Sequence, residues 1–411
     1  MPEQPLAGRT VIDLTNALAG PYATLLLAGL GATVVKVENP AGGDPARGNA
    51  PYAGRDGFSL ASRGDEDMSV SMLVRGRNKL GATLDLKNPR SREVFADLVR
   101  AADVVVENYS PGVTERLGVD YATVRGLNPR IVYTSITGFG PEGGPGPGKA
   151  MDTIVQALSG VMMTAGEPGE PPVRFGLPVG DLLAPLFAVI GTLSALVQAD
   201  RTGQGQHVDV SMLGALTSLV ACEPFEAQEA VGLEQRTGNL LPRLAPFGLL
   251  AASDGHIALC APTDPFAHGV LRAMDRADLV EDPRFGTRDE RVRNADALHA
   301  LIGDWARGRT AAEAVAALNA EGVAAAQVRG PVEAARDPLV TSREEVVPVD
   351  HPEFGTVEGL SATGLPIRFS DSRVGFDRPA PGLGADNHRV YGDLLGYTEE
   401  RIADLTAEAV I

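Results

Sequence analysis

The chain has 411 residues, of which 44% are hydrophobic and 22% charged, and a formal net charge of −17. This length suits two or three domains, and the composition is that of a globular protein. The excess of carboxylates argues against general binding to nucleic acid or to an anionic membrane, because both require a basic surface. We expect neither as a partner.

The first third of the chain alternates between short apolar runs and helical periodicity. Strands are predicted over residues 10–14, 33–38, 82–86, 103–107 and 130–136, and helices over 21–28 and 91–101. Strands that alternate with helices indicate a mostly parallel sheet with helices on both faces. We therefore predict an α/β fold with a large, Rossmann-like domain.

Asp181 stands where a Gly/Pro-rich stretch meets an uncharged run over residues 182–199. The run is near membrane-spanning length, but it contains Pro185, Gly191 and Gln198, and we interpret it as a buried helix. Asp181 then lies near the amino end of that helix. From the local pattern alone it is more often an N-cap than a nucleophile.

The remainder of the chain predicts a second helix over 208–220, a strand pair around Asp254-Gly255, charged helices over 266–321, and short strands from 346 before a last helix over 398–405. We expect a discontinuous large domain of residues 1–205 and 335–411 and a small α+β domain of residues 225–325. Residues 206–224 and 326–334 would be the linkers.

Cys222 and Cys260 sit in apolar surroundings and indicate buried thiols in a reducing compartment. The amino terminus lacks the pattern of a signal peptide, so we expect a cytoplasmic protein. None of the six histidines has metal-ligand spacing, and no metal site is predicted.

A near-match to a phosphate-binding loop covers residues 143–150. Its last position is Ala150 in place of the Ser or Thr that would hold magnesium, and two prolines remove backbone amides. We reject an ATPase on these grounds and keep Lys149 as a candidate contact for an anion.

Short blocks along nearly the whole chain recur together in one known family. They are Leu6-Ala7-Gly8-Arg9, Ala19-Gly20-Pro21-Tyr22, Lys36-Val37-Glu38-Asn39-Pro40, Asn78-Lys79, Glu107-Asn108-Tyr109-Ser110-Pro111-Gly112, Gly203-Gln204-Gly205-Gln206 and Asp282-Pro283-Arg284-Phe285. In this order they resemble the class III CoA-transferases, the CaiB/BaiF family that includes the formyl-CoA transferases.

The resemblance implies that Asp181 is the nucleophile. It would attack an acyl-CoA thioester to give a mixed anhydride, then an aspartyl-CoA thioester, from which CoA passes to a carboxylic acid. Coenzyme A and acyl-CoA are then substrates, and no permanently bound cofactor is expected. The resemblance also implies an interlocked homodimer.

The CoA contacts carried over by position are Lys36, Asn39, Leu84, Leu86, Asn108, Tyr109, Arg116 and Lys149. Asn108 and Tyr109 match an Asn-aromatic pair beside the adenosine, and Arg116 matches a basic residue near the phosphates. Asn39 stands where the family often has a basic residue. For Lys36, an ordinary charged residue is as good an interpretation as a ligand contact.

The substrate pocket departs from the formyl-CoA transferases at Leu18, Met151 and Asp152, which argues against a pocket specific for oxalate. Leu18 and Met151 favour a more apolar acid. The racemases of the same family provide an alternative function, but their catalytic His is Met151 here and their Glu falls near Thr263. A second alternative is a CoA-binding protein without catalysis, against which the retained Gly180-Asp181 pair argues.

Overall fold

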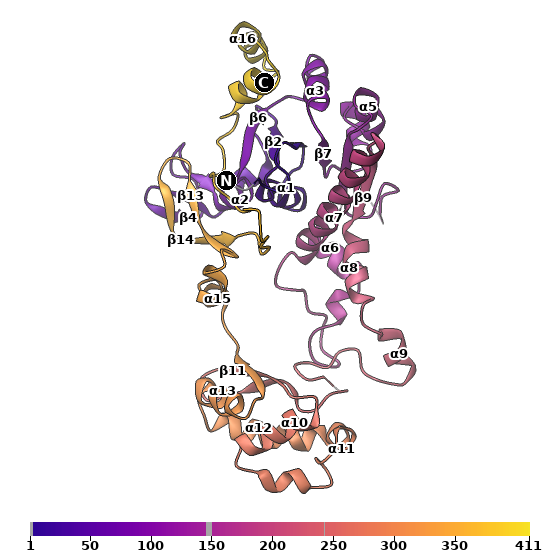
Figure 1. The fold of residues 1–411 in the computed structure, drawn as a ribbon, viewed down its shortest axis with the longest axis vertical. Helices are drawn as coiled ribbons and strands as arrows, with labels where there is room; N and C mark the ends of the chain where they lie inside the picture. Colours follow the sequence, from indigo (N-terminus) through magenta and orange to yellow (C-terminus); the bar gives the residue numbers. More distant parts are fainter. Residues whose placement is uncertain (1–2, 145–149, 242) are drawn as a thin grey trace. The chain divides into compact units, whose positions relative to one another are not determined.

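The computed structural model describes residues 3–144, 150–241 and 243–411, which divide into two compact units. The larger unit comprises residues 1–159, 175–220 and 335–411, and the smaller comprises 160–174 and 221–334. Each unit is described by itself below (Figure 1).

The larger unit holds a parallel sheet, two small antiparallel sheets and the helices packed on them. In chain order its elements are β1 (Thr10–Asp13), α1 (Ala19–Gly29), β2 (Thr33–Glu38), β3 (Tyr52–Gly54), β4 (Gly57–Ser59), β5 (Met68–Ser69), α2 (Val70–Arg75), β6 (Lys79–Thr83), α3 (Ser91–Arg100), β7 (Val104–Glu107), α4 (Val113–Leu117), α5 (Tyr121–Leu127), β8 (Val132–Thr137), α6 (Asp152–Leu158), α7 (Val179–Thr202), β9 (His207–Ser211), α8 (Met212–Val220), α15 (Pro338–Thr341), β13 (Val346–His351), β14 (Gly355–Thr363), η4 (His388–Leu394) and α16 (Glu399–Ala407).

Six parallel strands form the main sheet in the order β6-β2-β1-β7-β8-β9. The chain builds outwards from β1 in one direction and then, from β7, in the other, which is the doubly wound arrangement predicted from the sequence. In such sheets a ligand binds at the carboxyl ends of the strands, where the order reverses. Here that point lies between β1 and β7.

The predicted strands and helices of this sheet are mostly confirmed, with two corrections. The strand predicted over 82–86 is β6, which begins at Lys79 because it pairs with β2 from Val34 onwards and ends at Thr83. The predicted helix over 208–220 begins only at Met212. Its first part is β9, so the expected linker over 206–224 contains the sixth strand of the sheet.

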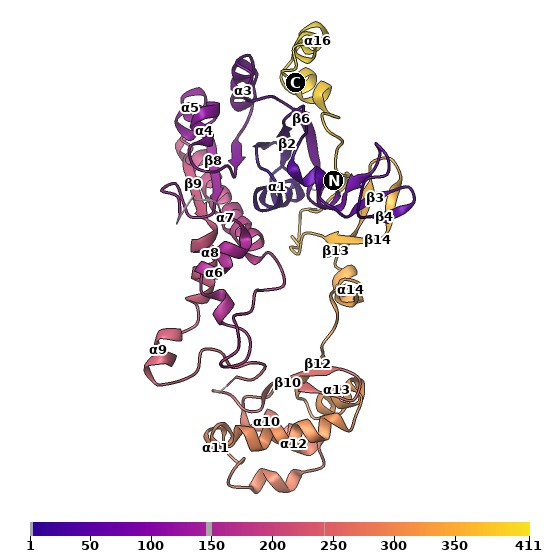
Figure 2. The ribbon, with the colours of Figure 1, turned by 180° about the vertical axis from the view of Figure 1, so that it is seen from behind.

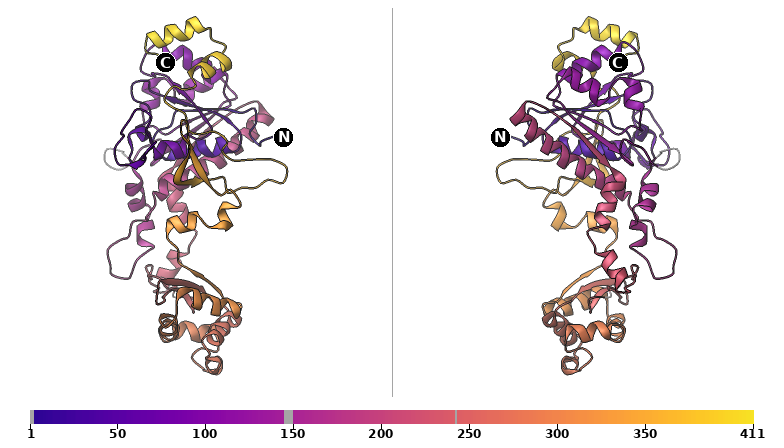
Figure 3. Two further views of the ribbon diagram at one scale, coloured as in Figure 1. Left: turned by 90° about the vertical axis from the view of Figure 1, so that its left-hand side faces the viewer. Right: turned by 90° about the vertical axis from the view of Figure 1, so that its right-hand side faces the viewer.

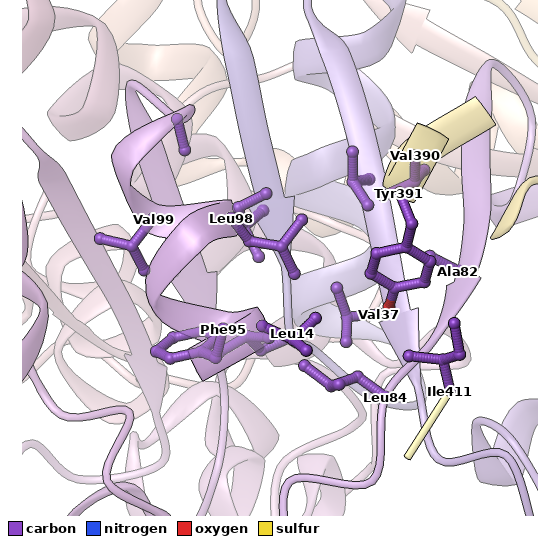
Figure 4. Packing of buried hydrophobic residues seen from close by; sticks show 14 of the residues in the cluster. Leu14, Val37, Ala82, Leu84, Phe95, Leu98, Val99, Val390, Tyr391 and Ile411 are labelled. Carbon is purple, nitrogen blue, oxygen red and sulfur yellow. The ribbon is translucent and has the colours of Figure 1, made fainter. Parts of the chain in front are cut away.

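The core beneath the sheet joins both ends of the chain (Figure 4). Leu14, Val37 and Phe95 come from the first hundred residues, whereas Tyr391 and Ile411 come from the last twenty-one. Helix α16 lies beside α3, where Arg401 pairs with Glu93 and the Tyr397 hydroxyl donates to Asp97 (Figure 3). The large unit is therefore discontinuous in sequence.

Helix α7 packs against α1, β8 and β9 (Figure 2). Within the described residues it is the one helix whose length and apolar composition would allow it to cross a membrane, and 39% of its most apolar window is buried. Core helices of globular domains meet the same criterion. The prediction of a buried helix holds for one face only, because Leu186, Phe187, Ile190 and Val197 are exposed.

The smaller unit is an antiparallel sheet, β10-β11-β12, packed on helices. Its elements are α9 (Phe225–Ala230), β10 (Phe247–Ala251), β11 (His256–Cys260), α10 (Asp264–Ala273), α11 (Arg288–Arg293), α12 (Ala295–Arg307), α13 (Ala311–Ala320), β12 (Ala324–Gln327) and α14 (Pro331–Ala335). The predicted strand pair around Asp254-Gly255 is β10 and β11.

Both cysteines are exposed, which contradicts the expectation of buried thiols. Cys260 ends β11, where Ile257 and Leu259 face the helices, so that the alternation of a strand places Cys260 on the opposite side of the sheet. Cys222 follows the end of α8 and lies outside the packed helix face.

Candidate active site

Most of the predicted contact residues follow the carboxyl ends of parallel strands. Leu18 follows β1, Asn39 follows β2, Leu84 and Leu86 follow β6, and Asn108 and Tyr109 follow β7. Strands β6, β2, β1 and β7 are consecutive in the sheet, so these positions gather along one edge. The edge includes the point between β1 and β7 where the strand order reverses, which is the expected place for a nucleotide-like ligand.

The side chain of Asn108 joins the loop after β7 to the loop after β1 at that point. Its Oδ1 accepts a hydrogen bond from the Asn16 amide at 2.8 Å, and its Nδ2 donates to the Asn16 carbonyl at 2.9 Å. The neighbouring Tyr109 packs against the core, and its amide donates to Glu107. Burial raises the pKa of Tyr109 to about 12, so the phenol stays neutral. The loops after β1 and β7 are thus held as one unit.

Lys36 differs from its predicted role as a CoA contact. Its side chain is 1% exposed, and its ammonium forms an ion pair of 2.9 Å with Asp44 and donates to the Thr15 carbonyl. A ligand cannot reach an ammonium that is enclosed in this way. Lys79 is similarly buried and pairs with Asp13 at 3.0 Å. Burial alone would raise the pKa of Asp13, but Lys79 and Lys36 hold it at about 2.

These buried charges fix the loop after β1. The Asp13 carboxylate accepts hydrogen bonds from the amide and hydroxyl of Thr15, and Asp44 accepts one from the Ala17 amide at 2.9 Å. Ala17 has a positive φ of 65°, which is strained for a residue with a Cβ. The buried ion pairs therefore hold the loop in a conformation that it would not adopt alone.

The other predicted contacts differ in how accessible they are. The Leu84 side chain is 1% exposed and points into the core between Val37 and Ile411, so it is unable to line a ligand pocket (Figure 4). Leu86 is half-buried against the same core. Asn39 and Arg116 are exposed. Lys149 lies outside the described residues.

Asp181 lies in the first turn of α7, two residues after its start, and is half-buried. Its carboxylate has no hydrogen bond or ion pair with any described residue. Burial and, second, the negative charge of Asp152 raise the pKa of Asp181 to about 6, against the opposing charge of Arg75. At neutral pH the carboxylate is therefore mainly ionised but poorly solvated, and such a carboxylate is more reactive than one in water.

Asp152 begins α6 and positions the backbone beside Asp181. Its Oδ1 accepts a hydrogen bond from the Gly180 amide at 2.8 Å, while its Oδ2 accepts one from Gln156 at 2.7 Å. A Cβ on Gly180 would lie 3.2 Å from Asp152 Oδ1, so that a side chain before Asp181 would crowd this hydrogen bond. Met151 is 73% exposed, and Leu18 is half-buried before α1.

Arg75 is a residue of this region that the sequence reasoning missed. It ends α2, donates from Nε to the Ala17 carbonyl at 3.1 Å, and acts electrostatically on Asp181. The sequence offered one signal, a second arginine two residues before Arg77 in a segment otherwise poor in charge. Its position relative to Asp181 depends on tertiary packing. Across the described ranges, no group of three His, Cys, Asp or Glu side chains could hold a metal ion.

Comparison with known proteins identifies a family and several relatives. The sequence pattern of CoA-transferase family III matches residues 6–387. A succinyl-CoA:mesaconate CoA-transferase from Haloarcula hispanica is 37% identical, over 92% of this chain and 93% of the relative. A succinyl-CoA–D-citramalate CoA-transferase from Chloroflexus aurantiacus is 33% identical, over 100% of this chain and 99% of the relative.

A solved structure has a similar fold. A CAIB/BAIF family protein from Brucella suis superposes with a TM-score of 0.81 at 31% identity, covering 95% of this chain and 99% of that chain.

Proposed function

The chain belongs to CoA-transferase family III, and from this membership we propose that it transfers CoA from an acyl-CoA thioester to a carboxylic acid through covalent intermediates on Asp181. The observation that carries the covalent step is the state of this side chain. It is half-buried in the first turn of α7, lacks a protein partner in the described part of the chain, and has a pKa of about 6. A carboxylate bound in a strong ion pair would be a poorer nucleophile.

In the proposed mechanism, one Asp181 oxygen attacks the thioester carbonyl and the CoA thiolate leaves, which gives a mixed anhydride. The thiolate then attacks the aspartyl carbonyl, releases the donor acid and forms an aspartyl-CoA thioester. The acceptor carboxylate attacks this thioester and expels the thiolate, which finally attacks the acceptor carbonyl and frees Asp181. One thioester replaces another, so that no external energy source is consumed.

The geometry of the sheet edge supports a place for CoA beside the loops after β2, β6 and β7. We assign Asn108 and Tyr109 to the adenosine, Arg116 to the phosphates, and Asn39, Leu86 and Lys149 to further contacts. Arg116 lies in α4 and is exposed. Its guanidinium is therefore accessible to a phosphate group from solvent. Leu84 and Lys36 contribute to the fold of this edge from the buried side.

A homodimer is part of the proposal. The exposed face of α7 carries Leu186, Phe187, Ile190 and Val197, and a contiguous apolar face of this kind is typical of an interface. We propose that a second copy of the chain covers it, in the interlocked manner implied by the family. Light scattering should give twice the mass of one chain, and a monomer at micromolar concentration would contradict this.

Mass spectrometry of the intact protein after incubation with a panel of acyl-CoAs tests the covalent step. We expect a CoA or acyl adduct on the wild type that hydroxylamine removes, and none on Asp181→Ala. If the wild type gives no adduct but exchanges an α-proton of the acyl group in deuterated water, the chemistry is that of a racemase. If it does neither but binds acyl-CoA, the protein is not a catalyst.

A further inference from the structure

Arg75 has hydrogen-bonding capacity that the protein does not use. Its Nε donates to the Ala17 carbonyl, which fixes the plane of the guanidinium. The two terminal nitrogens have no hydrogen bond or ion pair with a described residue. Burial lowers the pKa of Arg75, although the group remains a cation at any physiological pH. A half-buried guanidinium with a fixed orientation and free terminal nitrogens is suited to binding a planar anion in a bidentate manner.

Two carboxylates act on Arg75, and neither neutralises it by contact. Asp44 already pairs with Lys36 and accepts a hydrogen bond from Ala17. The negative charge of Asp181 interacts with Arg75 through space, yet the two side chains form no ion pair within 4 Å. The separation leaves the Asp181 carboxylate free to react and leaves the guanidinium free for another anion close to it.

We propose that Arg75 binds the carboxylate at the non-reacting end of a dicarboxylic acid and of its CoA thioester. This inference rests on the proposed function, because it assigns a substrate class to that same site. The reacting carboxylate of the acid loses its negative charge when it becomes a thioester. The far carboxylate is therefore the one anionic group that the donor acyl-CoA and the acceptor acid share. A permanent cation whose charge acts on Asp181 can recognise both substrates through this carboxylate.

The named substrates of the two relatives agree with this chemistry. Succinyl, mesaconate and D-citramalate groups each carry a second carboxylate beyond the one that exchanges CoA. Leu18 and Met151 can line the carbon chain between the two ends, which reconciles an apolar pocket with an anionic substrate. By binding the far carboxylate, Arg75 then holds the reacting carbonyl at a defined position relative to Asp181. A monocarboxylic acid of the same length binds more weakly, because it leaves the charge of Arg75 unpaired.

A paired-substrate experiment tests the role of Arg75. We would measure kcat/KM for succinate and for butyrate, which has the same chain length, with wild type, Arg75→Gln, Arg75→Lys and the exposed control Arg100→Gln. At pH 8 Asp181 is ionised throughout, so that a change in its pKa does not affect the comparison. We expect Arg75→Gln to lower kcat/KM for succinate about 10- to 100-fold. The kcat/KM for butyrate should change less than about threefold.

Arg75→Lys should recover part of the succinate activity, because it retains the charge without the paired donors. An equal loss for both acids would overturn the proposal and make Arg75 a structural anchor for Ala17. An unchanged preference for succinate in Arg75→Gln would overturn it as well.

A binding measurement separates this inference from the proposed function. In the Asp181→Ala background, calorimetry would compare succinyl-CoA with butyryl-CoA, with and without Arg75→Gln. If Arg75→Gln weakens the binding of succinyl-CoA but not that of butyryl-CoA, the role of Arg75 is supported even if the wild type transfers no CoA. If Arg75→Gln leaves the affinity for succinyl-CoA unchanged in the Asp181→Ala protein, the role of Arg75 is refuted even if the wild type transfers CoA.

Discussion

The carboxylate of Asp152 accepts a hydrogen bond of 2.8 Å from the amide of Gly180, the residue that precedes the proposed nucleophile. The same carboxylate raises the pKa of Asp181 by its negative charge. Asp152 therefore has two effects on one neighbour, a geometric effect through the backbone and an electrostatic effect through space.

Asp152→Asn should separate these two effects. An amide oxygen can still accept the Gly180 hydrogen bond, but the negative charge is lost. The acid limb of the pH profile of kcat/KM, expected near pH 6 for the wild type because Asp181 must be ionised, should move to lower pH. Asp152→Ala, which also removes the acceptor, should in addition lower activity on the plateau. An acid limb that does not move in Asp152→Asn would exclude the electrostatic effect.

Asp181→Asn should abolish transfer and stabilise the fold at neutral pH. The raised pKa means that the folded state resists ionisation of this group more than the unfolded chain does. The resulting loss of stability grows from about pH 4 and is complete above about pH 6. The shift corresponds to at most about 3 kcal/mol, and partial exposure reduces the expected gain to about 1–2 kcal/mol. Urea unfolding should show this gain at pH 7 and its disappearance near pH 4. Equal stabilities at pH 7 would contradict the raised pKa.

Lys36→Met should lower the stability of the fold and should have no direct effect on the affinity for CoA. The substitution leaves Asp44 buried without its cation, and breaking a buried pair from one side costs about 3–5 kcal/mol. Urea unfolding should therefore show a large loss of stability. The exposed Lys87→Met provides the control and should leave stability unchanged within about 0.5 kcal/mol. A fully stable Lys36→Met that binds CoA weakly would restore the ligand contact predicted from the sequence.

Asn108→Ala should weaken CoA binding and lower stability together. It removes both partners of the Asn16 backbone at the point where the strand order reverses, at a cost of about 1–3 kcal/mol. Asn128→Ala is a matched control, because the Asn128 side chain also bonds to the backbone, in this case by donating to the Val99 and Ala102 carbonyls, but lies away from the sheet edge. It should lower stability without changing the KM for acyl-CoA, and a similar rise in KM for both variants would argue against a contact at Asn108.

The parallel sheet could be predicted because its strands are continuous apolar runs bounded by turns. β2 was predicted over its observed residues, and β1 and β7 within one residue at one end. β9 was missed, although residues 207–211 alternate between polar and apolar side chains as a strand exposed on one side does. The apolar residues 212–220 that follow favoured one continuous helix from residue 208.

The site could be predicted only in part. The resemblance pointed to residues in loops that follow neighbouring strands of the sheet, but a sequence does not show whether a lysine faces solvent or an enclosed carboxylate. Lys36 is buried because Asp44 approaches it from another segment. Arg75 reaches the loop after β1 because α2 brings it to Ala17, 58 positions away in sequence. Both facts arise from tertiary packing between segments with no local signature.

The shared core of the two chain ends has a consequence for synthesis. When the first 220 residues have left the ribosome, all six strands of the parallel sheet exist, but the surface formed by Val37, Leu84 and Phe95 still awaits Tyr391 and Ile411. The smaller unit, by contrast, is almost entirely contained in residues 221–334 and can close first. The nascent sheet must therefore keep part of its apolar surface exposed until translation is almost complete, and transiently exposed surface of this kind is prone to aggregation.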